Sequence, residues 1–190
     1  KKEPITIEWM NGIKKDEVVI DIGANIGMYT LMSGVGREAI VYGFEPEASN
    51  YHLLVKNIKL NSMHDRIKTY CAGVLDYDGF SDLNIDDEVD DTLGGSNYSV
   101  DEEVGFDLKP MKVGYKQGIN VITLDSFCRK MNIKPDHIKI DVDGLEHRVI
   151  KGAVESILQA KTIIIELNTN LKEHIELVSF IKSFGFKLDE

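Results

Sequence analysis

The 190-residue sequence is poor in cysteine: it has only Cys71 and Cys128, and neither belongs to a Cys-x-x-Cys or a Cys/His spacing. This scarcity disfavours a disulfide or zinc site and predicts two reduced, buried thiols in a cytoplasmic protein. No stretch approaches the about 18 consecutive apolar residues of a membrane-spanning helix, so no span is expected. Residues 1–4 (Lys-Lys-Glu-Pro) lead into no apolar segment, so no signal peptide is expected either.

Positive charge is also scarce, with 22 Lys and Arg against 32 Asp and Glu and a net charge of −10. Residues 82–107 contain ten of the acids and no Lys or Arg, so the rest of the chain is balanced (32 − 10 = 22 acids against 22 bases). Because nucleic acids and anionic lipid surfaces are contacted through Lys and Arg, this distribution argues against both as partners. It also weakly disfavours an anionic substrate.

The remaining composition, 43% hydrophobic and 28% charged, is that of a globular protein, and we expect a single domain over residues 1–190. Apolar runs of strand length alternate with segments of helical periodicity. The predicted strands are residues 18–22, 39–44, 66–71, 137–142 and 162–167. Near-continuous apolar strands separated by helices predict an α/β fold with a doubly wound, mostly parallel, Rossmann-like sheet.

Helices are predicted between the strands from apolar residues spaced i, i+3, i+4 and i+7. The segments are 29–35, 51–58, 124–131, 145–158 and 171–181, together with a short helix around Trp9 that packs on the sheet. Thr123 is a predicted N-cap, Asn170 with Glu173 a capping box, and Gly185 a helix stop.

Residues 74–122 interrupt this alternation, because they combine several glycine-containing turns with the acidic run. We expect an irregular insertion at about 74–122 with room for a hairpin. Long loops of this kind are usually either functional or disordered. The insertion is therefore either a solvated loop or a lid over the site.

Residues 21–27 (Asp-Ile-Gly-Ala-Asn-Ile-Gly) lie where the first predicted strand turns into a helix, which is where open α/β sheets bind nucleotides. Gly23 allows a tight turn, Gly27 a close approach, and Asn25 a left-handed backbone. The spacing lacks the Gly-x-Gly-x-x-Gly of a dinucleotide site. Asp21 would repel a pyrophosphate, but a carboxylate suits S-adenosylmethionine (SAM), which has an ammonium and a sulfonium and no phosphate.

Glu45 is a second candidate contact, because it ends the second predicted strand 24 residues after Asp21. A carboxylate at this position accepts hydrogen bonds from the two hydroxyls of a ribose, and Pro46 restrains the backbone beyond it. The alternative is a strand-end acid paired with a neighbouring lysine.

Across residues 17–167 the sequence resembles the FkbM-type family of SAM-dependent methyltransferases. The resemblance rests on ordered blocks at 21–30, 44–46, 57, 72, 78–79, 123–125, 139–146 and 152–153. It implies a class I methyltransferase fold, SAM as the cofactor, and methylation of a hydroxyl on a sugar, glycan or polyketide-like molecule. The family usually has Glu where this chain has Asp143.

The class I fold ordinarily ends with a sixth strand and an antiparallel seventh. This sequence stops at Glu190, about where the sixth would begin. The expected C-terminal sheet edge is therefore either truncated or built without the final hairpin.

The predicted cofactor-binding set has three further members beside the loop and the Glu45 region. Tyr29 and Thr30 lie in the first helical turn after the loop, near the expected methionine moiety. Ala72 closes the third strand, where a small residue leaves room for adenine. The full set is Asp21, Gly23, Asn25, Gly27, Tyr29, Thr30, Glu45, Pro46 and Ala72.

Three carboxylates form the candidate catalytic cluster: Asp141, Asp143 and Glu146. Asp141 and Asp143 are two residues apart at a strand end and share a face. A carboxylate that accepts a hydrogen bond from a hydroxyl can be its general base, and Asp141 is the first choice, Asp143 the second. Asp143 and Glu146 could equally stabilise the first helical turn.

A second mechanism would place Mg²⁺ between Asp141, Glu166 and Asn168, because hard oxygen ligands suit that ion. We rank it below the metal-free mechanism and predict no metal site. An NAD-dependent oxidoreductase is disfavoured by the missing glycines and by Asp21. A non-catalytic binding module on a methyltransferase fold is disfavoured by the retained acids. The sequence identifies neither the acceptor nor the oligomeric state.

Overall fold

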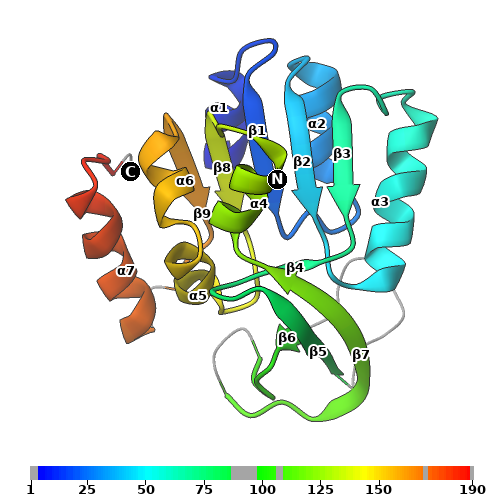
Figure 1. The fold of residues 1–190 in the computed structure, drawn as a ribbon, viewed down its shortest axis with the longest axis vertical. Helices are drawn as coiled ribbons and strands as arrows, with labels where there is room; N and C mark the ends of the chain where they lie inside the picture. Colours follow the sequence, from blue (N-terminus) through cyan, green and yellow to red (C-terminus); the bar gives the residue numbers. More distant parts are fainter. Residues whose placement is uncertain (1–3, 87–97, 106–108, 169–170, 189–190) are drawn as a thin grey trace.

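The predicted parallel sheet is present in the computed structural model, which describes residues 4–86, 98–105, 109–168 and 171–188 (Figure 1). Five parallel strands form it, in the order β3-β2-β1-β8-β9. Their bounds are β1 Val18–Ile22, β2 Ile40–Phe44, β3 Ile67–Tyr70, β8 His137–Ile140 and β9 Thr162–Ile165. All five therefore end at the same edge of the sheet, where a ligand of an open α/β fold is expected.

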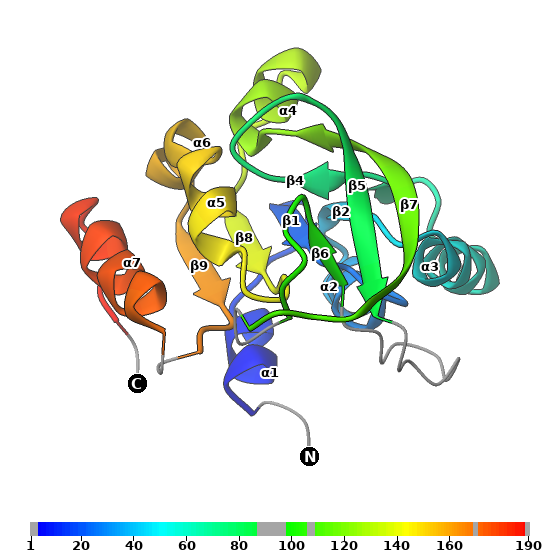
Figure 2. The ribbon, with the colours of Figure 1, turned by 90° about the horizontal axis from the view of Figure 1, so that it is seen from below.

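Helices cover both faces of this sheet, as a doubly wound fold requires (Figures 1 and 2). One face carries α1 (Pro4–Asn11), α2 (Met28–Gly36) and α3 (Ala48–Leu60). The other carries α4 (Leu124–Met131), α5 (Glu146–Lys151), α6 (Val154–Gln159) and α7 (Lys172–Ser183). Side chains alternate along β1 accordingly: Val19 belongs to the same buried cluster as Leu54 of α3, whereas Ile20 and Ile22 belong to the cluster that contains Leu124 of α4.

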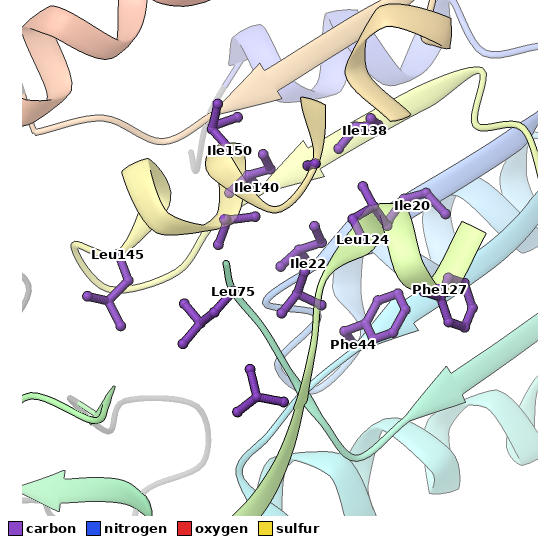
Figure 3. Close-up of a cluster of buried hydrophobic side chains, with 14 of the residues drawn as sticks. Ile20, Ile22, Phe44, Leu75, Leu124, Phe127, Ile138, Ile140, Leu145 and Ile150 are labelled. Carbon is purple, nitrogen blue, oxygen red and sulfur yellow. The ribbon is translucent and has the colours of Figure 1, made fainter. Parts of the chain in front are cut away.

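The larger of the two hydrophobic clusters lies between the sheet and the second group of helices (Figure 3). Ile20 and Ile138 are fully buried there, and Phe44 packs edge-on against Phe127 with ring centroids 4.8 Å apart. Leu75, from the segment after β3, belongs to the same cluster. The core thus extends beyond the parallel sheet into the insertion.

The insertion has more order than we expected, because it contains a second, four-stranded sheet in the order β4-β7-β5-β6. The bounds are β4 Gly73–Val74, β5 Gly79–Asp86, β6 Tyr98–Val100 and β7 Val113–Ile122. β5 pairs antiparallel with β6, the next strand in the chain, and with β7 on its other side. Leu83 and Val121 of this sheet point into the large cluster. Figure 2 shows the second sheet lying across the carboxyl edge of the first. Residues 87–97, with much of the acidic run, lie outside the described residues.

The single helix predicted over 145–158 is wrong, because the chain breaks there into α5 and α6. Gly152, between the two helices, packs closely against the backbone just after β4: a Cβ on it would lie 1.9 Å from the Leu75 carbonyl oxygen. Asp125 of α4 accepts hydrogen bonds from the backbone N–H groups of Glu155 and Ser156 and so caps α6 from outside. Contacts distant in sequence decide this boundary.

Of the other helix ends predicted from the sequence, those at Thr123 and Gly185 are confirmed. Thr123 is the N-cap of α4, its hydroxyl accepting from the Ser126 N–H, and Gly185 follows α7 with φ +95°. Asn170 of the predicted capping box lies outside the described residues, and Leu171 is the N-cap of α7. No strand follows α7 within the described residues, so the final hairpin is not among them. None of the helices described is both long and apolar enough to span a membrane.

Candidate functional site

The loop after β1 is held tightly at the carboxyl edge of the sheet. Gly23 has φ +77°, and a Cβ on it would lie 1.8 Å from the backbone oxygen of Asp141. Gly27, at φ +95°, is the N-cap residue of α2, and a Cβ there would lie 2.5 Å from a methyl carbon of Leu54. Asn25 also has a positive φ, +50°, as its residue type suggested. Close approach on both sides therefore requires glycine at both predicted positions.

Glu45 is completely buried at the end of β2 and faces this loop. Its Oε2 accepts a hydrogen bond from the Asn25 N–H at 2.8 Å and its Oε1 one from the Glu47 N–H at 2.9 Å. The Tyr98 hydroxyl lies 3.1 and 3.3 Å from the two carboxylate oxygens. Burial raises the pKa of Glu45 to about 7, although these hydrogen bonds oppose the rise. Among the residues that the structure describes, the partners of this acid are thus N–H and hydroxyl donors and not a lysine.

Asp21 is buried and already compensated by groups of the chain itself. Its Oδ2 accepts a hydrogen bond from the Thr30 hydroxyl at 2.6 Å, and its Oδ1 lies 3.3 Å from Lys139 Nζ. Lys139 also donates to Asp141 Oδ2 at 3.0 Å and lies 5.1 Å from the centroid of the Tyr29 ring. Burial alone would lower the pKa of Lys139, but the two carboxylates outweigh it and raise that pKa.

Lys139 compensates the negative charge of Asp21, whereas the prediction from the sequence assumed that this charge faces the ligand uncompensated. The lysine was within the quoted 139–146 block, but its partner became evident only from the register, in which Asp21 lies opposite Lys139 on neighbouring strands. The carboxylate still anchors the first turn of α2 through Thr30. Binding of a cofactor by Asp21 therefore stays a prediction, now with a structural role beside it.

Asp141 and Asp143 follow β8 and line one cavity together with Gly23, Pro46 and Ala72. Burial and the nearby Asp141 raise the pKa of Asp143 to about 6, opposed by a hydrogen bond from the Tyr98 N–H. The structure thus brings residues of the predicted cofactor set and two of the three candidate catalytic acids to one place. The cavity volume is about 40 Å³, well below the roughly 300 Å³ or more of typical ligand pockets.

A second, larger cavity of about 290 Å³ lies between α1 and the ends of β8 and β9. Ile5 of α1 and Ile164 of β9 contribute apolar walls, and Glu166 lines it as well. Asp141 lines both cavities, so it is the acid at their junction. Within the described ranges, no group of three or more His, Cys, Asp and Glu side chains could hold a metal ion.

Glu146, the third candidate catalytic acid, is buried and directed elsewhere. Its Oε2 lies 3.0 Å from His174 Nε2 of α7, and His174 Nδ1 accepts a hydrogen bond from the Asn168 N–H. Burial raises the pKa of Glu146 to about 8, with Asp143 and Asp141 adding to the rise and the N–H groups of Glu146 and Gly144 opposing it. The arrangement favours the alternative that Glu146 stabilises the helix start. No spacing in the sequence signalled His174 as its partner.

The model of the Methyltransferase FkbM domain family matches residues 21–188. In structure, the chain is similar to methyltransferase FkbM from Methylobacillus flagellatus KT, with a TM-score of 0.58 and 20% identity over 89% of this chain and 37% of that one. It is also similar to a precorrin-6y C5,15-methyltransferase from Geobacter metallireducens GS-15, with a TM-score of 0.57 and 10% identity over 100% and 74% of the two chains. Both likenesses concern the fold.

A curated protein from Pyrococcus horikoshii is 36% identical over 66 residues, which are 35% of this chain and 24% of that protein. It is a tRNA(Phe) (4-demethylwyosine(37)-C(7)) aminocarboxypropyltransferase. The chain thus spans about a quarter of that relative's length and 37% of the Methylobacillus structure.

Proposed function

This chain belongs to the FkbM methyltransferase family, and from that premise we propose that it transfers a methyl group from SAM to a hydroxyl oxygen. The acceptor class we propose is a sugar, glycan or polyketide-like small molecule. The observation that supports the proposal most is the buried Glu45 carboxylate, which faces the glycine loop and takes hydrogen bonds from N–H and hydroxyl donors. Ribose offers hydroxyl donors to the same kind of acceptor.

The residues present fit the cofactor in two respects. Gly23 and Gly27 allow the loop to pack against Asp141 and Leu54, and this packing holds the loop beside Glu45 at the carboxyl edge of the sheet, where open α/β folds bind nucleotides. Pro46 and Ala72 supply apolar and small lining next to Glu45, which suits a nucleoside. SAM would supply an electrophilic methyl group on a sulfonium.

Asp141 is the residue we propose as general base. It lies between the small cavity beside Gly23 and the larger cavity beside α1, and its side chain is 36% exposed. A carboxylate there can accept a hydrogen bond from the acceptor hydroxyl, orient its oxygen and take its proton. Lys139 holds the carboxylate in place through Oδ2, which leaves the other oxygen for the hydroxyl. Asp143 is the second choice.

We do not extend the tRNA substrate of the Pyrococcus relative to this chain, because the net charge of −10 opposes phosphate contacts. We propose a cytoplasmic protein, supported by the free thiols of Cys71 and Cys128, although only Cys128 is buried as predicted and Cys71 is exposed. Membership of a methyltransferase family argues against the NAD-dependent oxidoreductase considered from the sequence. A binding module without activity is the remaining alternative.

Cofactor binding is tested by calorimetry with SAM at pH 8, above the pKa of about 7 for Glu45. Glu45→Gln keeps the shape and removes the charge, and we expect roughly tenfold or greater weakening, because hydrogen bonds to charged groups contribute about 1.5–3 kcal/mol. The matched control is Glu38→Gln, since Glu38 is exposed and pairs with Lys15. Undiminished affinity in Glu45→Gln would refute the cofactor assignment.

Catalysis is tested by methyl transfer from labelled SAM to a panel of hydroxylated sugars and lipid-linked glycans, with Mg²⁺ and with chelator. Asp141→Asn should lower the rate about 100-fold or more while SAM affinity is retained, because a general base typically contributes 10²–10⁴. Loss of activity with chelator would instead support the Mg²⁺ mechanism. Tight SAM binding without transfer to any acceptor would favour the binding module.

A further inference from the structure

Tyr98, the first residue of β6, reaches from the second sheet into the site and contacts Glu45. Its hydroxyl lies 3.1 Å from Oε1 and 3.3 Å from Oε2, so one donor is shared by both carboxylate oxygens. The proposed function assigns those same two oxygens to the two ribose hydroxyls. The phenol hydroxyl and the ribose hydroxyls therefore require the same position.

Asn50 gives this position a second polar wall. The residue is 4% exposed in the first turn of α3, and its side chain interacts with the Tyr98 hydroxyl. Its Nδ2 nevertheless forms no hydrogen bond of normal geometry within the part of the chain that the structure describes. A buried amide donor without such a bond costs free energy that a ligand can recover. A ribose hydroxyl could donate to Glu45 and accept from Asn50.

Tyr98 is held at a second point, because its backbone N–H donates to the Asp143 carboxylate. The residue thus bridges the proposed cofactor acid and the acid cluster, and it lines the cavity of only about 40 Å³ between them. Its backbone pairs with β5, Tyr98 lying opposite Ile85. Because this cavity is far smaller than a nucleoside and Tyr98 lines it, a ribose at Glu45 requires the phenol to move.

We propose that Tyr98 occupies the ribose position of the cofactor site, with Glu45 and Asn50 as the two groups that bind ribose once the phenol leaves. Tyr98 then competes with the cofactor and limits its affinity. The apparent dissociation constant rises in inverse proportion to the fraction of molecules in which the phenol is displaced. This inference rests on the proposed function, since it assumes that ribose binds at Glu45.

The test is calorimetry with S-adenosylhomocysteine, which has the same ribose and cannot react. Tyr98→Phe keeps the ring and removes the competing hydroxyl, so we expect roughly tenfold tighter binding, the effect of one hydrogen bond to a charged group. The matched control is Tyr77→Phe, since the Tyr77 hydroxyl bonds Asp101 in the same insertion. Its affinity should equal that of the unaltered protein.

Asn50→Ala gives the second measurement. It should weaken binding several-fold, and the weakening should persist in the Tyr98→Phe background, because Asn50 contacts the ribose itself. Unchanged or weaker binding in Tyr98→Phe would overturn the inference while leaving the cofactor assignment intact, provided that Glu45→Gln still weakens binding. If neither the unaltered protein nor Tyr98→Phe binds S-adenosylhomocysteine, the proposed function and the inference both fail.

Discussion

Lys139 is 4% exposed and lies between two carboxylates, those of Asp21 and Asp141. Removing one partner of a buried ion pair leaves uncompensated charge and typically costs about 3–5 kcal/mol. We therefore expect Lys139→Met to lower the free energy of unfolding by about that amount, measured by urea denaturation.

The matched control for that variant is Lys172→Met, because Lys172 is exposed and pairs with Glu176 four residues along α7. Such a surface pair contributes about 0.5 kcal/mol or less. Adding Asp21→Asn to Lys139→Met should restore part of the lost stability, because it removes one of the two carboxylate charges that lose their lysine partner. Equal stability of Lys139→Met and the control would show that the buried pairing contributes nothing.

At the scale of single residues, the residue types at the strand ends predicted which positions form the glycine loop and its acidic neighbour, and the structure brings Gly23, Gly27 and Glu45 to the same edge of the sheet. Their neighbours were not predictable. Tyr98 reaches Glu45 from 53 residues away in sequence, and no spacing rule connects positions so far apart. Asn50 resembled any polar residue in a first helical turn.

Between elements, the Glu146–His174 contact joins the start of α5 to α7. The pKa of Glu146 is about 8 in the folded protein against an ordinary 4.5. A carboxyl with a raised folded pKa contributes stability that is complete below its unfolded pKa and is lost as the pH rises through its folded pKa. The free energy of unfolding should therefore fall from about pH 4.5 to about pH 8, by several kcal/mol from this group, because each unit of difference between the folded and unfolded pKa corresponds to about 1.4 kcal/mol.

Glu146→Gln imitates the protonated carboxyl and should flatten that fall, measured by urea denaturation at several pH values. It should not abolish the fall, because Glu45 and Asp143 also have raised pKa values, about 7 and about 6. Glu155→Gln is the control, since exposed Glu155 pairs with Arg129 on the surface. An unaltered pH dependence in Glu146→Gln would show that this carboxyl is not the titrating group.

Strands were easier to predict than helix limits, and the reason is physical. The five strands of the parallel sheet are buried on both faces, so continuous apolar runs mark them. The break between α5 and α6 depends on Gly152 meeting Leu75 and on the cap from Asp125, and both partners lie far away in sequence. Apolar periodicity continues through the break and gave no sign of it.

Over the whole molecule, the two sheets share one hydrophobic cluster, in which Leu83 of the insertion is fully buried. Leu83→Ala should cost about 2–5 kcal/mol, as for other buried leucines. If residues 1–190 form the single domain expected, the variant should also lower the unfolding midpoint reported by Trp9. That tryptophan is the only one in the chain and bonds Thr162 of the first sheet.

Fluorescence of Trp9 and far-ultraviolet circular dichroism should follow one common transition. Phe80→Ala on the same strand is the control, because Phe80 is 87% exposed and its loss should change stability by about 0.5 kcal/mol or less. A Trp9 midpoint that does not move in Leu83→Ala would mean that the insertion unfolds as a separate unit.

The α/β class and the family followed from the sequence because strand ends, loop and acids recur in a fixed order. The second sheet did not, because most of its exposed positions are polar, charged or glycine, and the glycines and acids in that stretch resembled a loop. Ile119 and Val121 are buried at alternate positions of β7, and in β5 the buried Leu83 is followed directly by the buried Asn84, so only β7 shows the alternation of a half-buried strand.

The insertion leaves the parallel sheet and returns to it at one point, because Gly73 and Val74 pair directly with Val121 and Ile122. Its two anchor points are therefore neighbours, and its length can change without displacing β3 or β8. Replacing all residues between these two anchor points is therefore equivalent, in topology, to replacing a single loop. Natural or engineered grafts at this point can diversify what covers the carboxyl edge of the parallel sheet, while the sheet itself stays unaltered.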